Sequence, residues 1–286
     1  MNTRFAALFA LSAFAVALHA QQGPPPPGPP PTLTKVKDDV YIVQNQANTM
    51  GDLIAYGGNA TAYITDAGVI LIDSKSDREH DDLIAKLKTL TDKPVKYVIL
   101  THNHGDHAGG AAKLAAMGAM VIISAYDRVN MVRSNEKFIP DFGYIGQAEL
   151  TLGGKRLELR QFRGHTRGDT AVYLPAARTI LLGDLLTTAD TIPMIVNYGD
   201  GGSWTDWTKS MDEILKIDFD IAIPGHGPMV NKGQVAEARS RFAAIQQRIR
   251  VLNREKKSQD EISQTLMKEF NWAPANNIPG MIQELR

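Results

Sequence analysis

The chain has 286 residues, 43% of them hydrophobic, which is enough to bury one sizeable core. Lys and Arg together number 31, as do Asp and Glu, which excludes the basic field that gathers nucleic acid or anionic membrane and makes a small-molecule substrate the default. Cysteine is absent, which excludes disulfides, thiolate nucleophiles and lipobox attachment and leaves His, Asp and Glu as metal ligands.

The N-terminal segment has the layout of a secretory signal. Arg4 precedes an apolar run over residues 5–18, and a small residue follows at Ala20. The run is too short to span a bilayer permanently, so residues 1–20 are predicted to be a cleaved signal peptide without stable membrane insertion. The mature protein is then expected to be periplasmic or secreted. The Pro-rich stretch that follows predicts an extended spacer over residues 21–35.

Two stretches of mixed strand and helix follow the spacer. Short β-rich runs bounded by Gly, Asn or Asp predict strands, and apolar residues at helical spacing predict helices. The first stretch predicts strands over residues 40–44, 60–65, 69–73 and 95–100 and a helix over 78–90. The second predicts strands over residues 156–162, 170–174, 179–182 and 221–224 and a helix over 204–216. Such halves favour an α+β fold of two packed sheets with helices outside.

The C-terminal part is helical in composition. Residues 234–270 carry an apolar stripe that includes Val235, Phe242 and Ile249, with basic residues between these positions. We therefore predict a helical extension over residues 233–286, packed on a catalytic domain over residues 36–232.

The strongest chemical signal follows the strand predicted at residues 95–100. The run Thr101-His102-Asn103-His104-Gly105-Asp106-His107 places three imidazoles and one carboxylate within six positions. These groups are natural ligands of divalent ions, and loops at strand ends present functional side chains. In extended backbone His102 and His104 share a face and can grip one ion, whereas Asp106 and His107 follow a turn and can address another. The run therefore suggests two neighbouring ions.

Two further histidines and one aspartate stand in Gly-flanked settings after predicted strands. His165 lies in Gly-His-Thr-Arg-Gly-Asp, His226 in Pro-Gly-His-Gly-Pro and Asp184 in Gly-Asp. A single histidine of this kind is more often a hydrogen-bonded loop residue, and a lone aspartate is more often a turn or cap residue. Together with the first run, these positions leave two of the seven histidines, His19 and His80, outside a motif.

In this order and spacing, the HxHxDH, GHTxGD, GD and PGHG motifs resemble the metallo-β-lactamase superfamily over about residues 40–230. The resemblance implies a four-layer αββα sandwich, here with C-terminal helices added. It also implies a ligand set: His102, His104 and His165 for one ion, Asp106, His107 and His226 for a second, and Asp184 as the bridge. Asp73 matches a family aspartate that supports the ligand loop.

The resemblance further implies a hydrolase with two zinc ions per chain. Two ions about 3.5 to 4 Å apart hold a hydroxide between them, because coordination lowers the pKa of water from about 15.7 to about 7. This metal-bridging hydroxide is expected to cleave an ester, thioester, lactone or β-lactam amide bond, with Asp106 as the catalytic residue that orients it. No separate general base is needed, which suits a chain without a Ser-His or Cys-His signature.

The substrate stays open, because this ligand set is shared across substrates. Asp184 stands where one class of lactamases carries Cys, and no Lys follows it closely, so the pattern is closer to glyoxalase II-like thioesterases. Thr187 stands where lactonases carry Tyr. The pocket is expected between loops 46–58, 132–146 and 187–203. Its candidate wall residues are Met131, Phe138, Phe142, Tyr144, Tyr198 and Trp204.

Other functions compete with this hypothesis. A β-lactamase fits export, since β-lactams meet their targets in the periplasm. An iron-dependent oxidoreductase similar to persulfide dioxygenases shares the fold, whereas flavodiiron-like members carry Glu in place of His104. Nucleic-acid processing needs a basic groove, which the neutral charge argues against. A protein that binds zinc without catalysis is expected to lack one or two ligands, and all seven are present. The oligomeric state is left open.

Overall fold

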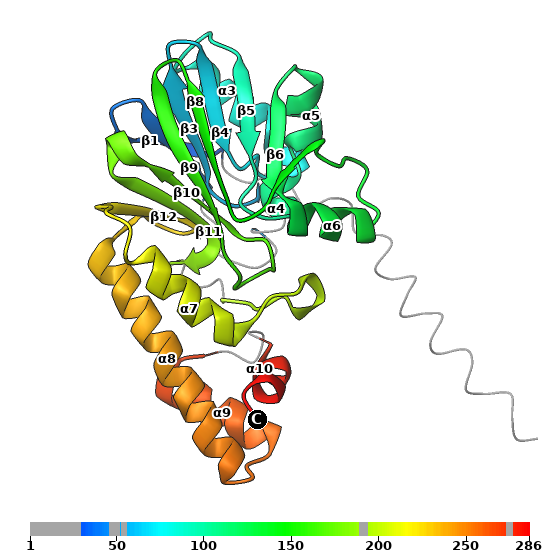
Figure 1. Cartoon of the computed structure of the whole chain (residues 1–286), viewed down its shortest axis with the longest axis vertical. Coiled ribbons are helices and arrows are strands. Elements are labelled where there is room, and N and C mark those ends of the chain that lie inside the picture. The colour runs from blue at the N-terminus through cyan, green and yellow to red at the C-terminus, as the bar shows by residue number, and fades with distance from the viewer. Residues whose placement is uncertain (1–29, 46–51, 53–55, 189–193, 273–276) are drawn as a thin grey trace, which may run out of the picture.

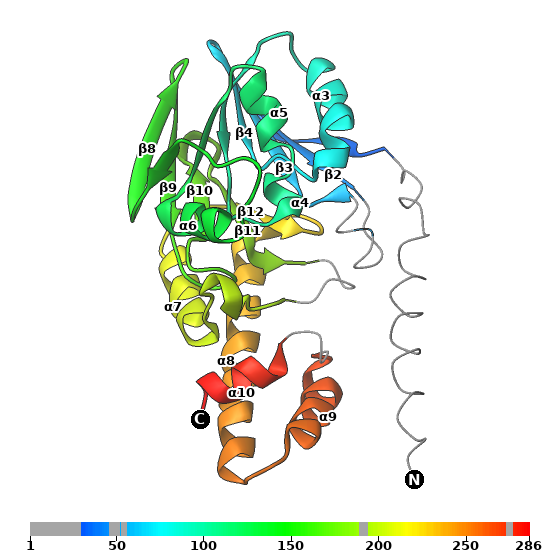
Figure 2. The ribbon, with the colours of Figure 1, turned by 90° about the vertical axis from the view of Figure 1, so that its right-hand side faces the viewer.

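Two β-sheets pack face to face, and helices cover their outer faces (Figure 1, Figure 2). This computed structural model describes residues 30–45, 52, 56–188, 194–272 and 277–286. The predicted signal peptide and most of the predicted spacer lie outside the described residues. The spacer's predicted end at residue 35 is wrong, because a strand begins at Thr32 and pairs with the strand that follows it.

The N-terminal sheet has seven strands that lie side by side in sequence order. The pairs from the first strand to the fourth are antiparallel, and those from the fourth to the seventh are parallel. The strands are β1 (Thr32–Lys37), β2 (Val40–Gln44), β3 (Ala60–Thr65), β4 (Gly68–Ile72), β5 (Val95–Ile99), β6 (Met120–Ser124) and β7 (Phe142–Tyr144). The helices between them are η1 (Asp77–Glu79), α3 (His80–Lys88), α4 (Gly105–Ala108), α5 (Ala111–Ala116) and α6 (Ala125–Arg133).

The second sheet has six strands in the order β13-β12-β11-β10-β9-β8. The strands are β8 (Gln147–Leu152), β9 (Lys155–Gln161), β10 (Thr170–Leu174), β11 (Thr179–Thr187), β12 (Ile221–His226) and β13 (Val230–Asn231). The helices of this half are η2 (Pro175–Ala177), η3 (Tyr198–Asp200), α7 (Trp204–Ile214), α8 (Lys232–Arg254), α9 (Gln259–Phe270) and α10 (Ile278–Glu284).

Alternating side chains along the strands produce the layers. In β4, Val69 and Leu71 pack in a core shared with α3 and α5, whereas Ile70 and Ile72 pack between the two sheets. In β11, Leu181 joins the core between the sheets, while its neighbours pack toward α7 and α8. Successive strand residues point to opposite faces, so each sheet is buried on both sides. The layers confirm the predicted αββα sandwich.

The C-terminal helices share the outer core of the second sheet. Phe242 of α8 packs against Trp204 and Trp207 of α7, with ring centroids 5.2 and 5.6 Å apart, and side chains of α9 and α10 join the same cluster. The helical stretch expected over residues 234–270 is two helices. The first helix ends at Arg254, and the side chain of Ser258 caps the start of α9. Trp204 is fully buried in this core, so its interpretation as a pocket wall is wrong.

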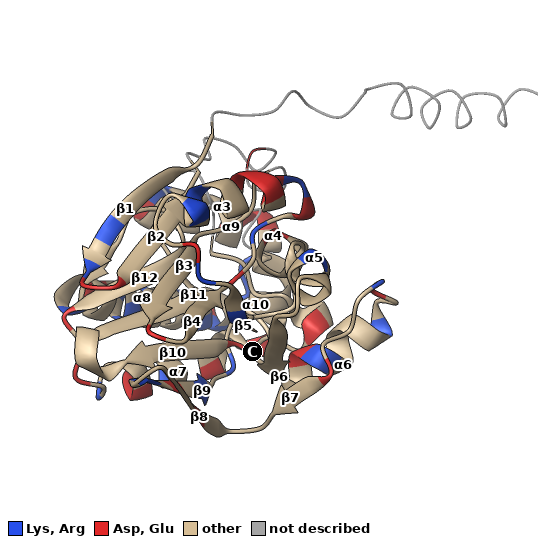
Figure 3. Ribbon diagram, turned by 90° about the horizontal axis from the view of Figure 1, so that it is seen from above, with Lys and Arg blue, Asp and Glu red and all other residues tan. Residues whose placement is uncertain are grey.

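Charged residues of both signs are mixed over the elements in Figure 3. Many form surface pairs, such as Arg248 with Glu269 and Arg239 with Asp212. Within the described ranges, none of the helices combines the length and the hydrophobicity needed to cross a membrane.

Candidate metal centre

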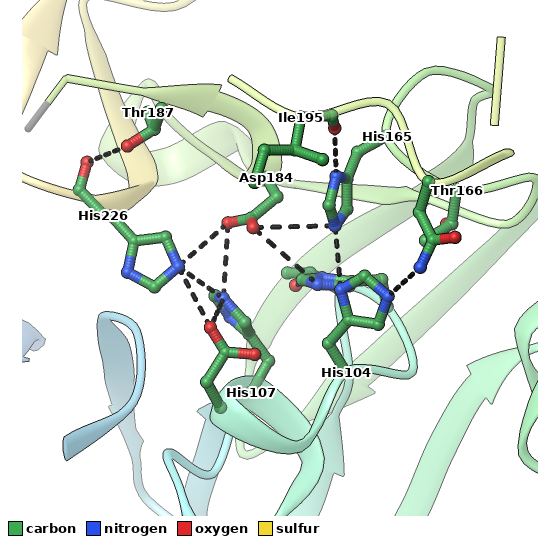
Figure 4. A network of polar contacts seen from close by, with 12 residues as sticks. His104, His107, His165, Thr166, Asp184, Thr187, Ile195 and His226 are labelled. Atoms are coloured by element: carbon green, nitrogen blue, oxygen red, sulfur yellow. Dashed lines mark hydrogen bonds and ion pairs between the residues drawn. The ribbon is translucent and has the colours of Figure 1, made fainter. Parts of the chain in front are cut away.

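The ends of several strands deliver the seven predicted ligands to one edge of the sandwich (Figure 4). The first run follows β5 and enters α4, His165 lies between β9 and β10, Asp184 lies within β11, and His226 ends β12. Their ligand atoms form two groups, each with all atoms within 4.8 Å of one another. One group is His102, His104 and His165, and the other is Asp106, His107, Asp184 and His226.

Asp184 belongs to the second group and also faces the first. Its Oδ2 atom lies 3.6 Å from Nε2 of His165 and 3.9 Å from Nε2 of His102. Its Oδ1 atom lies 3.3 Å from Nε2 of both His107 and His226. One carboxylate oxygen therefore faces each group, which is the geometry that a bridging ligand requires.

Strand β11 is longer than predicted. It continues past residue 182 to Thr187, and its pairing with β12 is irregular on both sides of Gly183. Irregular pairing of this kind redirects side chains and is common beside active sites. Asp184 is thus presented from within a strand, not from a loop beyond it.

Within the second group, Asp106 contacts both histidines. Its Oδ2 atom lies 3.3 Å from Nε2 of His226 and 3.6 Å from Nε2 of His107, and the two Nε2 atoms are 3.1 Å apart. Burial alone would raise the pKa of Asp106, but His107 and His226 outweigh it and hold that pKa below its ordinary value. Asp106 is therefore an ionised carboxylate at neutral pH.

Two buried ligand atoms of the site form ion-pair contacts but no hydrogen bond among the described residues. Nε2 of His102 and Oδ1 of Asp184 are buried and form no hydrogen bond within the described chain. Buried polar atoms are normally satisfied, so these two fit a ligand that the protein does not itself supply. Burial lowers the pKa of His102 well below its usual range and that of His165 to about 4, which keeps both neutral as metal ligation requires. The donor set thus fits divalent cations.

Asp73 fixes the tautomer of His107. Its Oδ2 atom accepts hydrogen bonds from Nδ1 of His107 and from Oγ1 of Thr101, both at 2.8 Å, and Oδ1 accepts the backbone N–H of Thr101 at 2.7 Å. This contact holds Nδ1 as the donor, so Nε2 of His107 faces the second group. Burial alone would lower the pKa of His107, but the charges of Asp106, Asp184 and Asp73 outweigh it and raise that pKa well above its usual value, so a bound cation would take the place of a proton on Nε2. This is the supporting position that the resemblance implies for Asp73.

His104 is oriented by a residue that the sequence did not reveal. Its Nε2 atom lies 3.0 Å from Oδ2 of Asp200, and its Nδ1 atom lies 2.9 Å from Nε2 of His165. Because a carboxylate only accepts, Asp200 favours a proton on Nε2, which leaves Nδ1 to ligate. The Nδ2 atom of Asn197 lies 2.8 Å from the same Nε2. The hydrogen bond from His104 is the main cause that lowers the pKa of Asp200 to about 2. Asp200 also accepts hydrogen bonds from Arg133, Asn103 and Asn197, at 2.8, 3.2 and 2.9 Å.

Two buried carboxyls, Asp127 and Asp169, anchor the turn that carries His165. The Thr166 hydroxyl lies 3.0 Å from Oδ2 of Asp127 and 2.7 Å from Oδ1 of Asp169. One hydroxyl proton serves one of these contacts, so a proton on a carboxyl is needed for the other. Burial raises the pKa of Asp127 to about 7, and burial together with the Asp127 charge raises that of Asp169 well above its usual range.

Two glycines are required by close approach to the ligands. A Cβ atom on Gly225 would lie 2.0 Å from Oδ1 of Asp184, and one on Gly58 would lie 2.3 Å from Cε1 of His107. Any larger residue at either position would displace a predicted ligand. The glycine before His226 in the PGHG motif therefore has a packing role.

A cavity of about 580 Å³ opens over both groups. His104, Asp106, His165 and Asp184 form one side. Ile195, Val196 and Asn197 form another, and Asn277 joins them from the start of α10. The loop predicted at residues 187–203 thus contributes to the pocket, whereas most of loop 46–58 lies outside the described residues.

The other candidate wall residues have different places. The Tyr144 hydroxyl is buried 2.7 Å from Oγ1 of Thr170, and the Tyr198 hydroxyl donates to Glu284 at 2.7 Å. Met131 and Phe138 line a neighbouring cavity. Phe142 is exposed and lines neither of these two cavities.

Known proteins resemble this chain in both sequence and fold. A family model described as "Metallo-beta-lactamase superfamily" matches residues 53–226. "Metallo-beta-lactamase domain-containing protein 1" of Xenopus laevis is 30% identical over 199 residues, which cover 65% of this chain and 79% of that protein. "Metallo-beta-lactamase type 2" of Bacillus cereus is 27% identical over 206 residues, which cover 71% of this chain and 78% of that protein. The solved structure of a metallo-beta-lactamase from Pontibacter korlensis has a TM-score of 0.67 at 23% identity and covers 74% of this chain and 99% of that one.

Proposed function

This chain belongs to the metallo-beta-lactamase superfamily, whose members are generally metal-dependent hydrolases, and on that premise we propose that it uses two zinc ions to hydrolyse an ester, thioester or lactone. The observation that carries the proposal is the position of Asp184. One of its oxygens faces His102 and His165, and the other faces His107 and His226. A site for a single ion has no need of such a bridge.

The proposed ligand roles follow the two groups. His102, His104 and His165 would hold the first ion, Asp106, His107 and His226 the second, and Asp184 both. A site of imidazoles and carboxylates without thiolate suits zinc. When bound, two zinc ions supply Lewis acidity and lower the pKa of water from about 15.7 to about 7, which provides a nucleophile at neutral pH.

Asp106 has a second proposed role. It lines the cavity as an ionised carboxylate, so it can accept a hydrogen bond from the attacking water and orient that water toward the substrate. Hydrolysis then adds the elements of water across the C–O or C–S bond and gives a carboxylic acid and an alcohol or thiol. No residue of the chain needs to form a covalent bond with the substrate.

Ester-like substrates are favoured over β-lactams by the sequence at the bridge. Asp184 replaces the cysteine of one lactamase class, and the next lysine along the chain is Lys209. Ile195 and Val196 line the cavity beside the ligands, and their side chains suit an uncharged part of a substrate.

A panel of substrates tests the function. The zinc-loaded protein would be assayed with S-lactoylglutathione, homoserine lactones, aryl esters, nitrocefin and aryl phosphates. We expect turnover of at least one of the first three and little turnover of the phosphate. Turnover of nitrocefin alone would reassign the protein as a β-lactamase, and oxygen consumption with an iron-loaded sample and a persulfide would reassign it as an oxidoreductase.

We also propose that the protein is exported. The support is Arg4 and the apolar run over residues 5–18. N-terminal sequencing of the periplasmic fraction should find a mature chain that begins near residue 21. A cytosolic product that retains Met1 would contradict export.

A further inference from the structure

A second cavity of about 460 Å³ adjoins the cavity of the metal centre. Asp77 and Gly105 line both cavities, so the second one begins directly beside the ligand loop. Its volume lies within the range of small-molecule sites. The hydrolytic chemistry described above makes no use of this space.

Four apolar side chains form one part of the lining of the second cavity. Ala108 and Met131 are buried, Phe138 is half-buried and Ala112 is exposed. Met131 and Phe138 also pack in the outer core of the N-terminal sheet, which holds this wall in place. The charged residues of the lining have both signs: Asp77 and Glu136 are acidic and Lys137 is basic. Asp77 is paired with Lys113 at 3.1 Å, so its charge is offset outside the cavity.

Gly105 leaves the junction between the two cavities open. A Cβ atom built on this residue meets no atom within 4 Å, in contrast to the glycines that pack against ligands. Gly105 lies between His104 and Asp106, so the open space begins next to both ligand groups. An arm of a molecule bound at the metal centre can therefore extend past Gly105 without displacing a side chain.

We propose that the second cavity binds an uncharged, apolar arm of the substrate while the scissile carbonyl lies at the metal centre. This inference rests on the proposed function and narrows the substrate class to esters or thioesters with an alkyl or aryl chain on one side of the bond. Each methylene that leaves water strengthens binding by roughly fourfold, so kcat/KM rises with chain length until the cavity is filled.

The test uses two substrate series with the zinc-loaded protein. One series lengthens the acyl chain of p-nitrophenyl esters from acetate to octanoate, and the other lengthens the leaving group of acetyl thioesters. Ala112→Leu fills the second cavity from α5, and Gly105→Leu closes the junction where there is open space. Ala116→Leu is the matched control, because this exposed residue on the same helix lies outside both linings.

We expect kcat/KM to rise at least tenfold along one series for the wild type and for Ala116→Leu. The ratio of kcat/KM for the longest substrate to kcat/KM for the shortest should fall at least fivefold in Ala112→Leu and in Gly105→Leu. The zinc content of each variant would be checked. Octanoate should bind without being hydrolysed, so calorimetric titration with octanoate should show weaker binding to these two variants than to the wild type.

Equal kcat/KM values along both series, or kcat/KM ratios that the two variants leave unchanged, would overturn this inference and leave the proposed function standing. Absence of all hydrolysis would instead refute the function, and the octanoate titration would then decide whether the cavity binds an apolar chain.

Discussion

Nε2 of His104 lies 3.0 Å from Oδ2 of Asp200, and this contact turns Nδ1 of His104 toward the first ligand group. Partners of this kind fix the tautomer and orientation of ligating histidines, and their loss typically costs about 10-fold to 100-fold in metal affinity. Asp200 is therefore a positioning residue that acts through His104.

Replacement of Asp200 by alanine should weaken binding of one zinc ion by about 10-fold or more, because His104 loses its orientation. Asp200→Asn keeps an acceptor oxygen and should recover part of that affinity. Zinc affinity would be measured by competition with a chromophoric chelator. Asp212→Ala is the control, since it also removes an arginine partner, Arg239, and belongs to neither ligand group and neither cavity lining. Equal affinities in all four proteins would remove Asp200 from the site.

The side chain of Glu284 ties α10 to the start of α7. It accepts hydrogen bonds from the hydroxyls of Tyr198 and Ser203 at 2.7 and 2.6 Å, and from the backbone N–H groups of Trp204 and Thr205 at 2.8 and 2.9 Å. Burial alone would raise the pKa of Glu284, but these hydrogen bonds outweigh it and hold that pKa below its usual value.

Glu284→Ala should lower the free energy of unfolding by about 2 kcal/mol, because backbone donors at the start of α7 lose a charged acceptor. The same variant should weaken zinc binding, since Tyr198 belongs to η3, which carries Asp200. Urea denaturation and chelator competition measure the two effects. Glu269→Ala, which removes a surface pair with Arg248, should cost less than about 1 kcal/mol and leave zinc binding unchanged. If Glu284→Ala lowered the free energy of unfolding as little as Glu269→Ala does, Glu284 would be an ordinary surface residue.

Stability should fall as the pH rises toward neutrality because of Asp127. Its pKa is raised by burial from 3.8 to about 7, so the folded protein binds a proton that the unfolded chain has released between these values. The stabilisation is complete below about pH 4 and is lost as the pH rises through 7, with a size on the order of 4 kcal/mol.

Asp127→Asn should flatten that part of the pH profile and stabilise the protein at pH 8. An amide can accept from Asn130, which lies 3.0 Å away, and donate to Thr166, as the protonated carboxyl does. Urea denaturation at several pH values gives the profile. Asp81→Asn, a change on the exposed face of α3, should leave the wild-type slope intact. A variant that keeps the wild-type slope between about pH 4 and pH 8 would show that Asp127 does not hold this proton.

Asp184→Asn should reduce turnover by about two or more orders of magnitude, because an amide offers one good oxygen donor and no charge to two cations. Occupancy of the second ion should fall more than that of the first, while a cooperative melt persists. Metal analysis and thermal denaturation of the variant, beside Asp81→Asn, separate these effects. Wild-type turnover with two bound ions would exclude the bridging role.

The sequence was informative wherever local pattern decides structure. The ligand motifs directly follow short apolar runs, and such runs form buried strands whose ends present side chains at one edge. His102, His165 and His226 therefore meet although they are far apart in the chain. The alternation in β4 likewise sorts Ile70 and Leu71 onto opposite faces, so the layers could be predicted.

Other parts of the site depend on contacts that leave no local pattern. Asp200 reaches His104 across 96 residues, and Glu284 reaches Tyr198 across 86. Each lies in a segment whose composition is that of an ordinary turn or helix end. Trp204 is instead predicted to belong to the site, although it lies outside it. An aromatic residue beside a loop suggests a pocket wall, and only the position of α8 shows that this side chain is buried in the core.

The most direct test of the two-zinc account is a titration of the metal-free protein with zinc while hydrolysis of the best substrate from the panel is followed. The account predicts that the rate increases until two equivalents per chain have been added and then stays constant. A rate that saturates at one equivalent, or a protein that zinc leaves inactive and iron activates, would contradict it.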